Sequence, residues 1–216
     1  MMKKFKKNEK NDLLKTIGIV TMIVDHIGLI LFPQIQVFRV VGRVAFPIFA
    51  FAISDGYKHT SNLKKYFFRL FVFATVSQIP FMLAVNPWKL NVIFTLALSL
   101  AVVHFLKNKK YIAALVLVVL SIVIPMDFGL YGALAASLFY FFKNKGYQIG
   151  AFVVLTIVHA AILGWAIQLL SIFGVLLILF FPDRMPKVQL PKYFFYWFYP
   201  VHLLLLFAIK QYLMTK

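Results

Sequence analysis

The sequence predicts an all-α, polytopic membrane protein with about nine membrane-spanning helices. Hydrophobic residues make up 62% of its 216 positions and charged residues only 13%, and the mean hydropathy is +0.89. Soluble domains are about half apolar and about a quarter charged. The polar breaks between the apolar runs are too short to form a separate soluble domain. We therefore expect residues 1–216 to form a single domain in or against the bilayer.

Apolar runs of spanning length, about 17–25 residues, follow one another along the chain. The first predicted helix covers residues 13–32 and follows a basic tail at 1–12; it lacks a small-residue cleavage site, so we interpret it as a retained span. The remaining predicted helices cover residues 37–57, 66–85, 90–106, 110–125, 127–142, 147–164, 165–181 and 193–213. Totals of eight or ten stay open, because 110–142 and 147–181 can each be divided differently.

Basic residues occupy alternate breaks between these helices. The formal net charge of +17 would indicate a nucleic-acid partner in a soluble protein. In polytopic proteins, however, Lys and Arg concentrate in cytoplasmic loops. Most of the 23 basic residues lie in the N-terminal tail and in every second break after it. We therefore expect a multi-pass protein with its N-terminus in the cytoplasm, surrounded by lipid and without a nucleic-acid partner. The chain contains no cysteine, and we expect no metal site.

Two ionisable residues interrupt the first apolar run, in TIGIVTMIVDHIGLILF at 16–32. A charge deep in a span costs about 2.5–3.5 kcal/mol on the insertion scale, so Asp25 and His26 need partners or a function. Lys15 precedes His26 by eleven residues, which places both on one helix face about 16 Å apart. Asp25 points about 100° away from His26, so we do not expect it to orient that ring.

The second helix carries Arg39 and Arg43 on one face, since they are spaced i,i+4. Arg43 reaches about the depth of Asp25, so an Asp25–Arg43 ion pair explains both residues structurally. That pair leaves His26 without an explanation.

A second histidine occurs at a similar depth in the last helix, in KYFFYWFYPVHLLLLF at 192–207. Pro200 cannot donate to the carbonyl of Tyr196, so we expect a kink just before His202. The first aromatic residues of this stretch fit an interfacial belt. Tyr199 and His202 lie deeper than a belt requires.

Three further polar clusters have a structural and a functional interpretation. The break at 54–70 holds Lys58, Lys64, Lys65 and Arg69; positive-inside charge explains most of them, while clustered basic side chains also suit an anionic cofactor. Ser77-Gln78-Ile79-Pro80 predicts a break in the third helix that lines a cavity. Asp127 begins the sixth predicted helix and is interpreted as its cap.

Several motifs together resemble one known family. MIVDHIG, FRVVGRVAFPIFAFAISDGY, the KHTSN…YFFRL…SQIPF run, NVIFTL, MDFGLYGAL and FYWFYPVHLL occur in this order over nearly the whole chain. Together they resemble the TraX family, polytopic inner-membrane proteins whose best-known member N-acetylates the F-pilus subunit. The resemblance implies a place in the bacterial cytoplasmic (inner) membrane and membership of a wider group of transmembrane acyltransferases.

That group implies roles for particular residues. In its acyltransferase-3 branch, a basic residue, ten intervening residues and a histidine mark the first helix, and Lys15 and His26 match this spacing. A basic pair associated with acyl-CoA is loosely matched by Lys65 and Arg69. The chain reads FFPDRMPK where many relatives carry a YNGKRG-like segment, and only Arg184 substitutes there.

The resemblance thus implies acetyl transfer from acetyl-CoA to an amine or hydroxyl, with His26 as general base. The acceptor is expected to be a peptide N-terminus, a glycan or a lipid-linked intermediate. The cofactor is expected to contact Lys15, Gln78, Arg184 and the basic cluster of Lys58, Lys64, Lys65 and Arg69. Candidate donors to the oxyanion are His202, Tyr199, Gln78 and Arg43. Asp25 is expected mainly to hold Arg43, with a direct catalytic role as the alternative.

Two other classes of function stay open. Asp25, His26, Arg43 and His202 also suit a proton or ion relay in a transporter, although no internal repeat is visible. A non-catalytic assembly factor is the third interpretation.

Overall fold

The computed structural model describes residues 9–182, 191 and 193–215, and within these residues the chain is helical. The helices are α1 (Glu9–Ile30), α2 (Gln36–Gly42), α3 (Ala45–His59), α4 (Leu63–Ala84), α5 (Val92–Lys107), α6 (Tyr111–Val123), α7 (Gly129–Phe141), α8 (Lys145–Leu163), the 3₁₀ helix η1 (Ala166–Ser171), α9 (Ile172–Phe180) and α10 (Phe194–Met214). The described part of the chain has no β-strand, only an isolated bridge between Leu90 and Met126. The all-α prediction is confirmed.

Among the residues that the structure describes, four stretches are long and apolar enough to cross a membrane: Asp12–Ile30, Gln36–His59, Leu63–Ala84 and Lys145–Ile162. Shorter apolar helices cover Val92–Lys107, Tyr111–Val123, Gly129–Phe141 and Ala166–Phe180. Each predicted span has a helical counterpart. The total of nine crossings and the cytoplasmic N-terminus stay predictions.

Three predicted features differ in the structure. The second span is divided between α2 and α3, because Pro47 cannot donate to the carbonyl of Arg43 and its ring crowds that carbonyl. The prediction of a break at Ser77-Gln78-Ile79-Pro80 is wrong, since α4 continues through Pro80 to Ala84; spanning helices tolerate proline where neighbouring groups satisfy the freed carbonyl. The stretch at 165–181 begins as the 3₁₀ helix η1.

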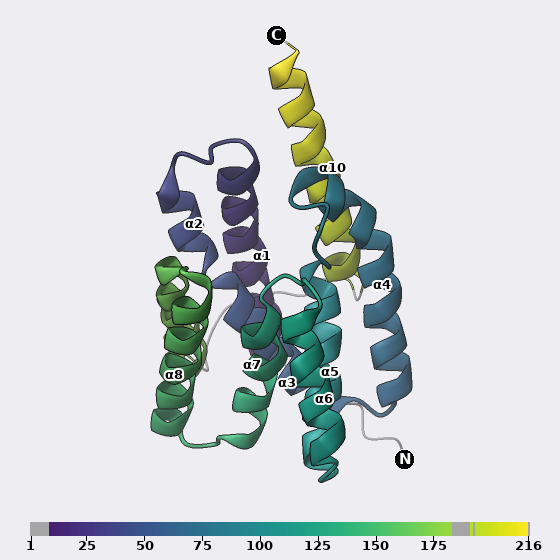
Figure 1. The fold of residues 1–216 in the computed structure, drawn as a ribbon, viewed down its shortest axis with the longest axis vertical. Coiled ribbons are helices and arrows are strands. Elements are labelled where there is room, and N and C mark those ends of the chain that lie inside the picture. Colours follow the sequence, from purple (N-terminus) through teal and green to yellow (C-terminus); the bar gives the residue numbers. More distant parts are fainter. Residues whose placement is uncertain (1–8, 183–190, 192, 216) are drawn as a thin grey trace.

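The helices alternate in direction, which gathers the basic loops at one end of the bundle. Figure 1 shows the α3–α4, α5–α6 and α7–α8 loops together at its lower end. These loops, with the helix ends beside them, carry Lys58, Lys64, Lys65, Lys107, Lys109, Lys110, Lys143 and Lys145. We call this end the basic end. The α4–α5, α6–α7 and α8–η1 loops belong to the opposite ends of their helices.

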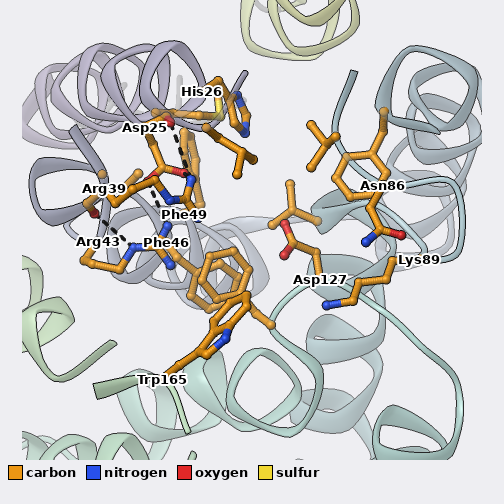
Figure 2. A pocket seen from close by; sticks show the side chains of 18 residues that line it. Asp25, His26, Arg39, Arg43, Phe46, Phe49, Asn86, Lys89, Asp127 and Trp165 are labelled. Atoms are coloured by element: carbon orange, nitrogen blue, oxygen red, sulfur yellow. Dashed lines mark hydrogen bonds and ion pairs between the residues drawn. The ribbon is translucent and has the colours of Figure 1, made fainter. Parts of the chain in front are cut away.

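Helix lengths create a recess away from the basic end. α1 and α4 have 22 residues and α10 has 21, whereas α5 has 16 and α6 and α7 have 13 each. At about 1.5 Å per residue, the long helices outreach the short ones by about 8–13 Å. The loops at the ends of the short helices border a cavity of about 230 Å³, which Figure 2 shows from close by.

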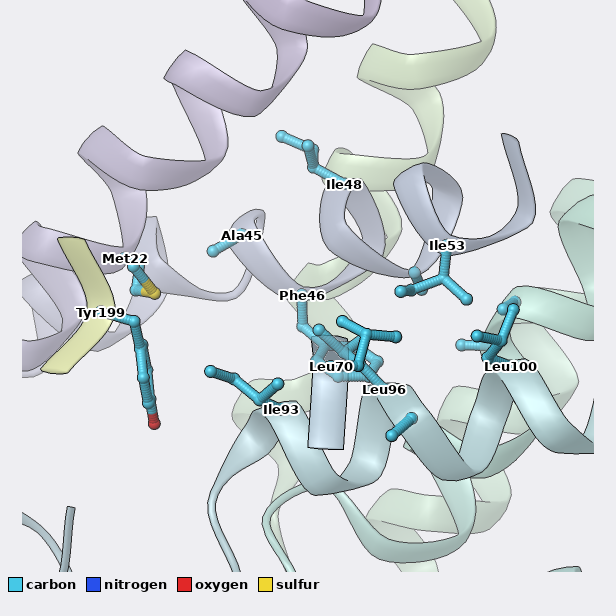
Figure 3. Close-up of a cluster of buried hydrophobic side chains, with 14 of the residues drawn as sticks. Met22, Ala45, Phe46, Ile48, Ile53, Leu70, Ile93, Leu96, Leu100 and Tyr199 are labelled. Atoms are coloured by element: carbon cyan, nitrogen blue, oxygen red, sulfur yellow. The ribbon is translucent and has the colours of Figure 1, made fainter. Parts of the chain in front are cut away.

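The core that carries this cavity is centred on α3, which packs against α1, α5, α7 and α9. Phe46, Ile48, Ile53, Leu96 and Leu100 are among its buried side chains (Figure 3). α10 lies against α4 and α1. It thereby brings the last helix of the chain beside the first one.

Candidate functional site

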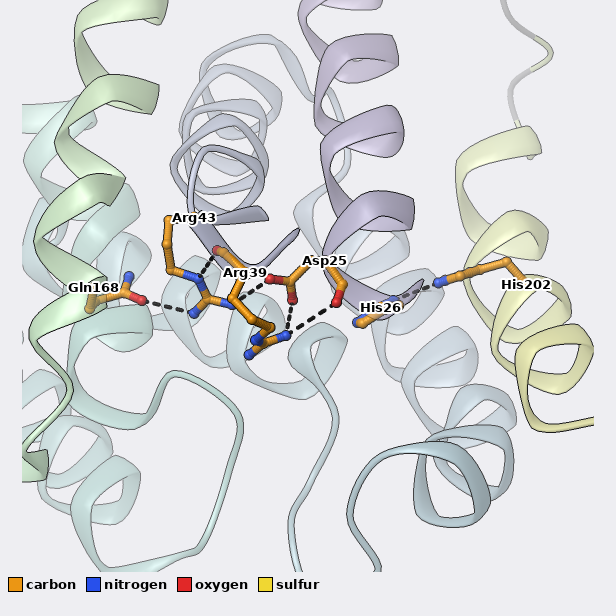
Figure 4. Close-up of polar contacts among 6 residues, drawn as sticks. All are labelled: Asp25, His26, Arg39, Arg43, Gln168 and His202. Carbon is orange, nitrogen blue, oxygen red and sulfur yellow. Dashed lines mark hydrogen bonds and ion pairs between the residues drawn. The ribbon is translucent and has the colours of Figure 1, made fainter. Parts of the chain in front are cut away.

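Asp25 on α1 binds two arginines, not one. Its Oδ1 accepts a hydrogen bond of 2.7 Å from Nη2 of Arg43, and its Oδ2 accepts one of 2.5 Å from Nη1 of Arg39 (Figure 4). The predicted Asp25–Arg43 ion pair is present; Arg39 as a second partner was missed. Nη1 of Arg43 also donates to Oε1 of Gln168 at 3.0 Å. One carboxylate between two guanidinium groups leaves this cluster with a formal charge of +1.

The close approach of α2 to α1 depends on Gly42. A Cβ at this position would lie 2.0 Å from Oδ1 and 2.2 Å from Cβ of Asp25. Only a residue without a side chain lets α2 come this close. Arg39 and Arg43, which flank Gly42, thereby reach Asp25 from one side.

His26 and His202, far apart in sequence, meet in the structure. Nδ1 of His26 lies 2.7 Å from Nε2 of His202 (Figure 4). Their ring centroids are 5.0 Å apart, and both residues are buried. Tyr199 packs against both rings, with centroid distances of 6.2 Å to His26 and 5.6 Å to His202. Three candidate residues on α1 and α10, His26, Tyr199 and His202, therefore form one cluster, whereas Asp25 beside His26 in the sequence is directed at the two arginines.

The hydrogen bonds of the histidine pair assign its protons. Nδ1 of His202 lies 2.9 Å from the carbonyl oxygen of Phe198, and a carbonyl oxygen only accepts, so this nitrogen carries hydrogen. In a neutral His202, Nε2 is then an acceptor, and Nδ1 of His26 must donate to it. Neutral His26 therefore keeps its lone pair on Nε2. This is the arrangement that a general base requires, and it makes His202 an orienting partner.

The cavity has two walls of different composition. Asp25, His26, Arg39 and Arg43 stand on one side and Asn86, Lys89 and Asp127 on the other, with Trp165 at the edge (Figure 2). The remaining lining residues are largely apolar: Met22, Leu29, Gly42, Ala45, Phe46, Phe49, Phe81, Val85, Val92 and Phe128. A mostly apolar pocket with a few convergent polar groups is the usual form of a small-molecule site.

Backbone hydrogen bonds fix the second wall. The amide of Leu90 donates to the carbonyl of Pro125, and the amide of Asp127 donates to the carbonyl of Leu90, both at 2.9 Å. These bonds join the α4–α5 loop to the α6–α7 loop. Nε2 of Gln78 donates to the carbonyl of Lys89 at 2.8 Å, and its Oε1 accepts from the amide of Asn91 at 3.0 Å. Gln78 thus holds a loop in place; its predicted contact with a cofactor stays a prediction.

Asp127 does not cap α7, so that interpretation is wrong. The residue that precedes α7 is Phe128, in the left-handed conformation with φ of 62°, and no side chain caps the helix. Left-handed backbone costs a non-glycine residue about 1–2 kcal/mol. The Phe128 ring stacks on Phe46, with a centroid distance of 4.1 Å, and lies 5.8 Å from Cζ of Arg43. Burial raises the pKa of Asp127 to about 6, and the positive charge of Arg43 opposes this rise.

Apart from Gln78, the described cofactor candidates lie toward the basic end. Lys58 approaches the ring of Tyr140 at 5.6 Å, and Lys64 and Lys65 are exposed. Nε of Arg69 donates to the hydroxyl of Tyr196 at 2.9 Å. Lys15 pairs with Asp12 at 3.6 Å. Arg184 lies outside the described residues.

Lys89, Asn86 and Trp165 were not singled out as site residues. Asn86 and Lys89 lie in the α4–α5 loop, and Trp165 lies in the α8–η1 loop. No hydrophobic periodicity in a sequence links such loop positions. One feature of the sequence did distinguish Lys89. It is the one basic residue in the predicted breaks on the side opposite the N-terminus. Within residues 9–182 and 193–215, no group of three or more His, Asp or Glu side chains could hold a metal ion.

The model of the TraX protein family matches residues 10–210. The chain belongs to the TraX family. A probable fimbrial assembly protein, FimC, of Dichelobacter nodosus is 26% identical over 93% of this chain and 95% of its own length. An uncharacterized protein of Rickettsia prowazekii is 29% identical, and the protein TraX of Escherichia coli is 27% identical, each over 47% of this chain.

The matches to these last two relatives cover only 40% of the Rickettsia protein and 42% of the Escherichia coli protein. No solved structure matches the chain. The family match and the apolar helices together indicate a membrane protein.

Proposed function

We propose that this TraX-family protein is a membrane-embedded acyltransferase that moves an acetyl group from acetyl-CoA to an amine or hydroxyl acceptor. The observation that supports it most is the histidine pair beside the cavity. Nε2 of His26 is a free base there, because Nδ1 is committed to His202. We further propose that the protein is multi-pass in the bacterial cytoplasmic membrane, with the basic end in the cytoplasm.

The reaction balances with this one base. The acceptor N–H or O–H gives its proton to Nε2 of His26 as the nucleophile attacks the thioester carbonyl. The tetrahedral intermediate expels the thiolate of CoA, and His26 returns the proton to that sulfur. The new bond joins acceptor and acetyl group, and the broken bond is the thioester C–S bond. A positioned base contributes about 10²–10⁴-fold to such a step.

Tyr199 is the oxyanion donor that the geometry favours among the four candidates. Its hydroxyl is buried and finds no acceptor among the described residues, so its proton is available. Gln78 and Arg43 are engaged with the α4–α5 loop and with Asp25, and His202 with His26. A hydrogen-bond donor directed at the developing negative charge, in a site without water, commonly stabilises the transition state by about 3–4 kcal/mol.

The donor approaches from the basic end in this proposal. Lys58, Lys64, Lys65 and Arg69 bind the phosphates, together with Lys15. Tyr196, which holds Arg69, precedes His202 by six residues on α10, or about 9 Å along the helix. A pantetheine arm that passes along α10 therefore leads from the phosphate site to the histidine pair.

The proposal is tested with the full chain in nanodiscs. Acetyl-CoA is titrated while the melting temperature is followed, for wild type, His26→Ala and the double variant Lys65→Ala/Arg69→Ala. Stabilisation is expected in wild type and His26→Ala, and its loss is expected in the double variant. Labelled acetyl transfer to a mixed panel of peptides, amines and sugars should then require His26. Absence of stabilisation in the wild type well above cellular acetyl-CoA concentrations would refute the mechanism.

The relay interpretation makes a different prediction. Asp25 is held by two guanidinium groups, which does not favour a carboxylate that gains and loses protons. A relay predicts proton flux into liposomes that His26→Ala abolishes, with no dependence on acetyl-CoA. An assembly factor predicts that His26→Ala leaves pilus-related function intact.

A further inference from the structure

We infer that the second wall of the cavity, formed by Asn86, Lys89 and Asp127, together with Trp165 at the cavity edge, is the binding subsite for a sugar as acyl acceptor. We call these four residues the loop subsite. The inference rests on the proposed function, which assigns the chemistry to His26 but leaves the acceptor open.

The loop subsite is preorganised. The two backbone hydrogen bonds between Leu90 and the 125–127 segment hold the loops of Lys89 and Asp127 at a fixed separation. Thr95 on α5 donates its hydroxyl to the carbonyl of Asp127. Gln78 anchors Lys89 from α4. Binding therefore does not have to order these loops, which lowers its entropic cost.

Its polar side chains are unsatisfied toward the cavity. The carboxylate of Asp127 makes no hydrogen bond or ion pair among the described residues, and the Lys89 ammonium makes no ion pair there, although both line the cavity. Oδ1 of Asn86 accepts from the amide of Trp88 at 2.8 Å, so its Nδ2 is the end left to donate. An ionised carboxylate in a mostly apolar cavity is costly without a partner. A bound ligand that donates to it would remove that cost.

The mixture of donors and an acceptor selects the ligand class. A hydroxyl group donates and accepts at once, so sugar hydroxyls can satisfy Asp127 and Lys89 or Asn86 together. An alkylammonium ion would satisfy Asp127 alone. It would also meet Lys89 and the +1 cluster of Asp25, Arg39 and Arg43, which repels a cation. The charges therefore favour a neutral, hydroxylated acceptor.

Trp165 supplies an apolar surface for such a ring. Its side chain is 45% exposed and lies at the cavity edge, and Nζ of Lys89 lies 5.5 Å from its ring centroid. An indole face can cover the apolar face of a sugar while the hydroxyls bind at its rim. The subsite belongs to loops at the end opposite the basic end, so the acceptor enters from there and the donor from the other side.

Ligand-observed saturation-transfer NMR on the full chain in nanodiscs, without CoA, tests the inference independently of catalysis. The probes are methyl glucoside, n-butylammonium and an alanine-rich hexapeptide. Wild type should bind methyl glucoside best. Asp127→Asn and Trp165→Leu should each weaken binding at least about tenfold, as expected for loss of a charge-assisted hydrogen bond or a ring contact. Lys89→Met is a second variant that keeps the length of the side chain.

Trp88→Leu is the matched control. Trp88 is 84% exposed, lies in the same loop as Lys89 and is not part of the cavity lining, so binding should not change. All variants should keep the wild-type melting temperature and its shift with acetyl-CoA.

The outcomes separate the two proposals. Absent sugar binding with acetyl-CoA stabilisation retained would overturn the loop subsite and leave the acyltransferase intact. Sugar binding that depends on Asp127 without acetyl transfer would support the subsite and reject the acyltransferase. Tighter binding of the hexapeptide or of butylammonium would overturn the sugar class.

Discussion

Replacing His202 tests the assignment of the proton on His26. In His202→Leu, Nδ1–H of His26 loses its acceptor, and a buried donor without a partner costs about 1–3 kcal/mol. The ring can relieve this cost by moving its proton to Nε2, which removes the base from the cavity side. If the whole cost falls on the transition state, kcat decreases about 5- to 150-fold. KM for acetyl-CoA should change little, because His202 lies beyond the proposed phosphate site.

His202→Gln supplies the discriminating comparison. The amide oxygen of glutamine reaches about the position of Nε2 and accepts from His26, so kcat should recover by most of that factor. Val201→Leu, at a 59% exposed position on the same helix, controls for general effects on α10. The assay is single-turnover transfer from labelled acetyl-CoA with the acceptor that the panel identifies. A His202→Leu enzyme within twofold of wild type, or glutamine no better than leucine, would refute the assignment.

Three further predictions concern the ion-pair cluster and the topology. Asp25→Asn should lower stability by about 3–5 kcal/mol, because it leaves the buried guanidinium group of Arg43 and the partly exposed one of Arg39 without a counter-ion. Adding Arg43→Met should recover part of the loss in thermal melts, and an unchanged melting temperature in the single variant would contradict the role of the pair. Gly42→Ala should cost about 1–3 kcal/mol through its clash with Asp25, whereas Gly150→Ala, whose Cβ meets nothing within 4 Å, should be neutral in the same melts. Since the chain has no cysteine, Trp88→Cys in intact cells should react with a membrane-impermeant maleimide and Lys110→Cys only after lysis; the reverse pattern would place the basic end outside.

Much of the fold follows from hydropathy alone. Apolar runs and basic breaks determine where helices occur, and the predicted ranges differ from the observed helices mainly where proline acts. Pro47 divides a span, whereas Pro80 leaves α4 continuous. A local rule cannot separate these cases, because the outcome depends on the neighbours that satisfy the freed carbonyl.

The first wall of the cavity was more predictable than the second. Asp25, His26 and Arg43 stand out because charge is rare in spans, and helical geometry places them at one depth. Arg39 required the packing of α2 on α1 that Gly42 permits. Asn86, Lys89 and Asp127 depend on hydrogen bonds between two loops, and such tertiary contacts leave no periodic signal.

The sequence separations of these contacts also set an order of assembly. Asp25 and Arg43 are 18 residues apart, so their ion pair can form once the first two predicted spans have been inserted. His26 and His202 are 176 residues apart, so their hydrogen bond must wait for the last helix. A chain stopped before α10 would already have Asp25 paired with its arginines, while His26 would not yet be oriented by His202. The proposed catalytic base would therefore become oriented only when synthesis of the chain is nearly complete.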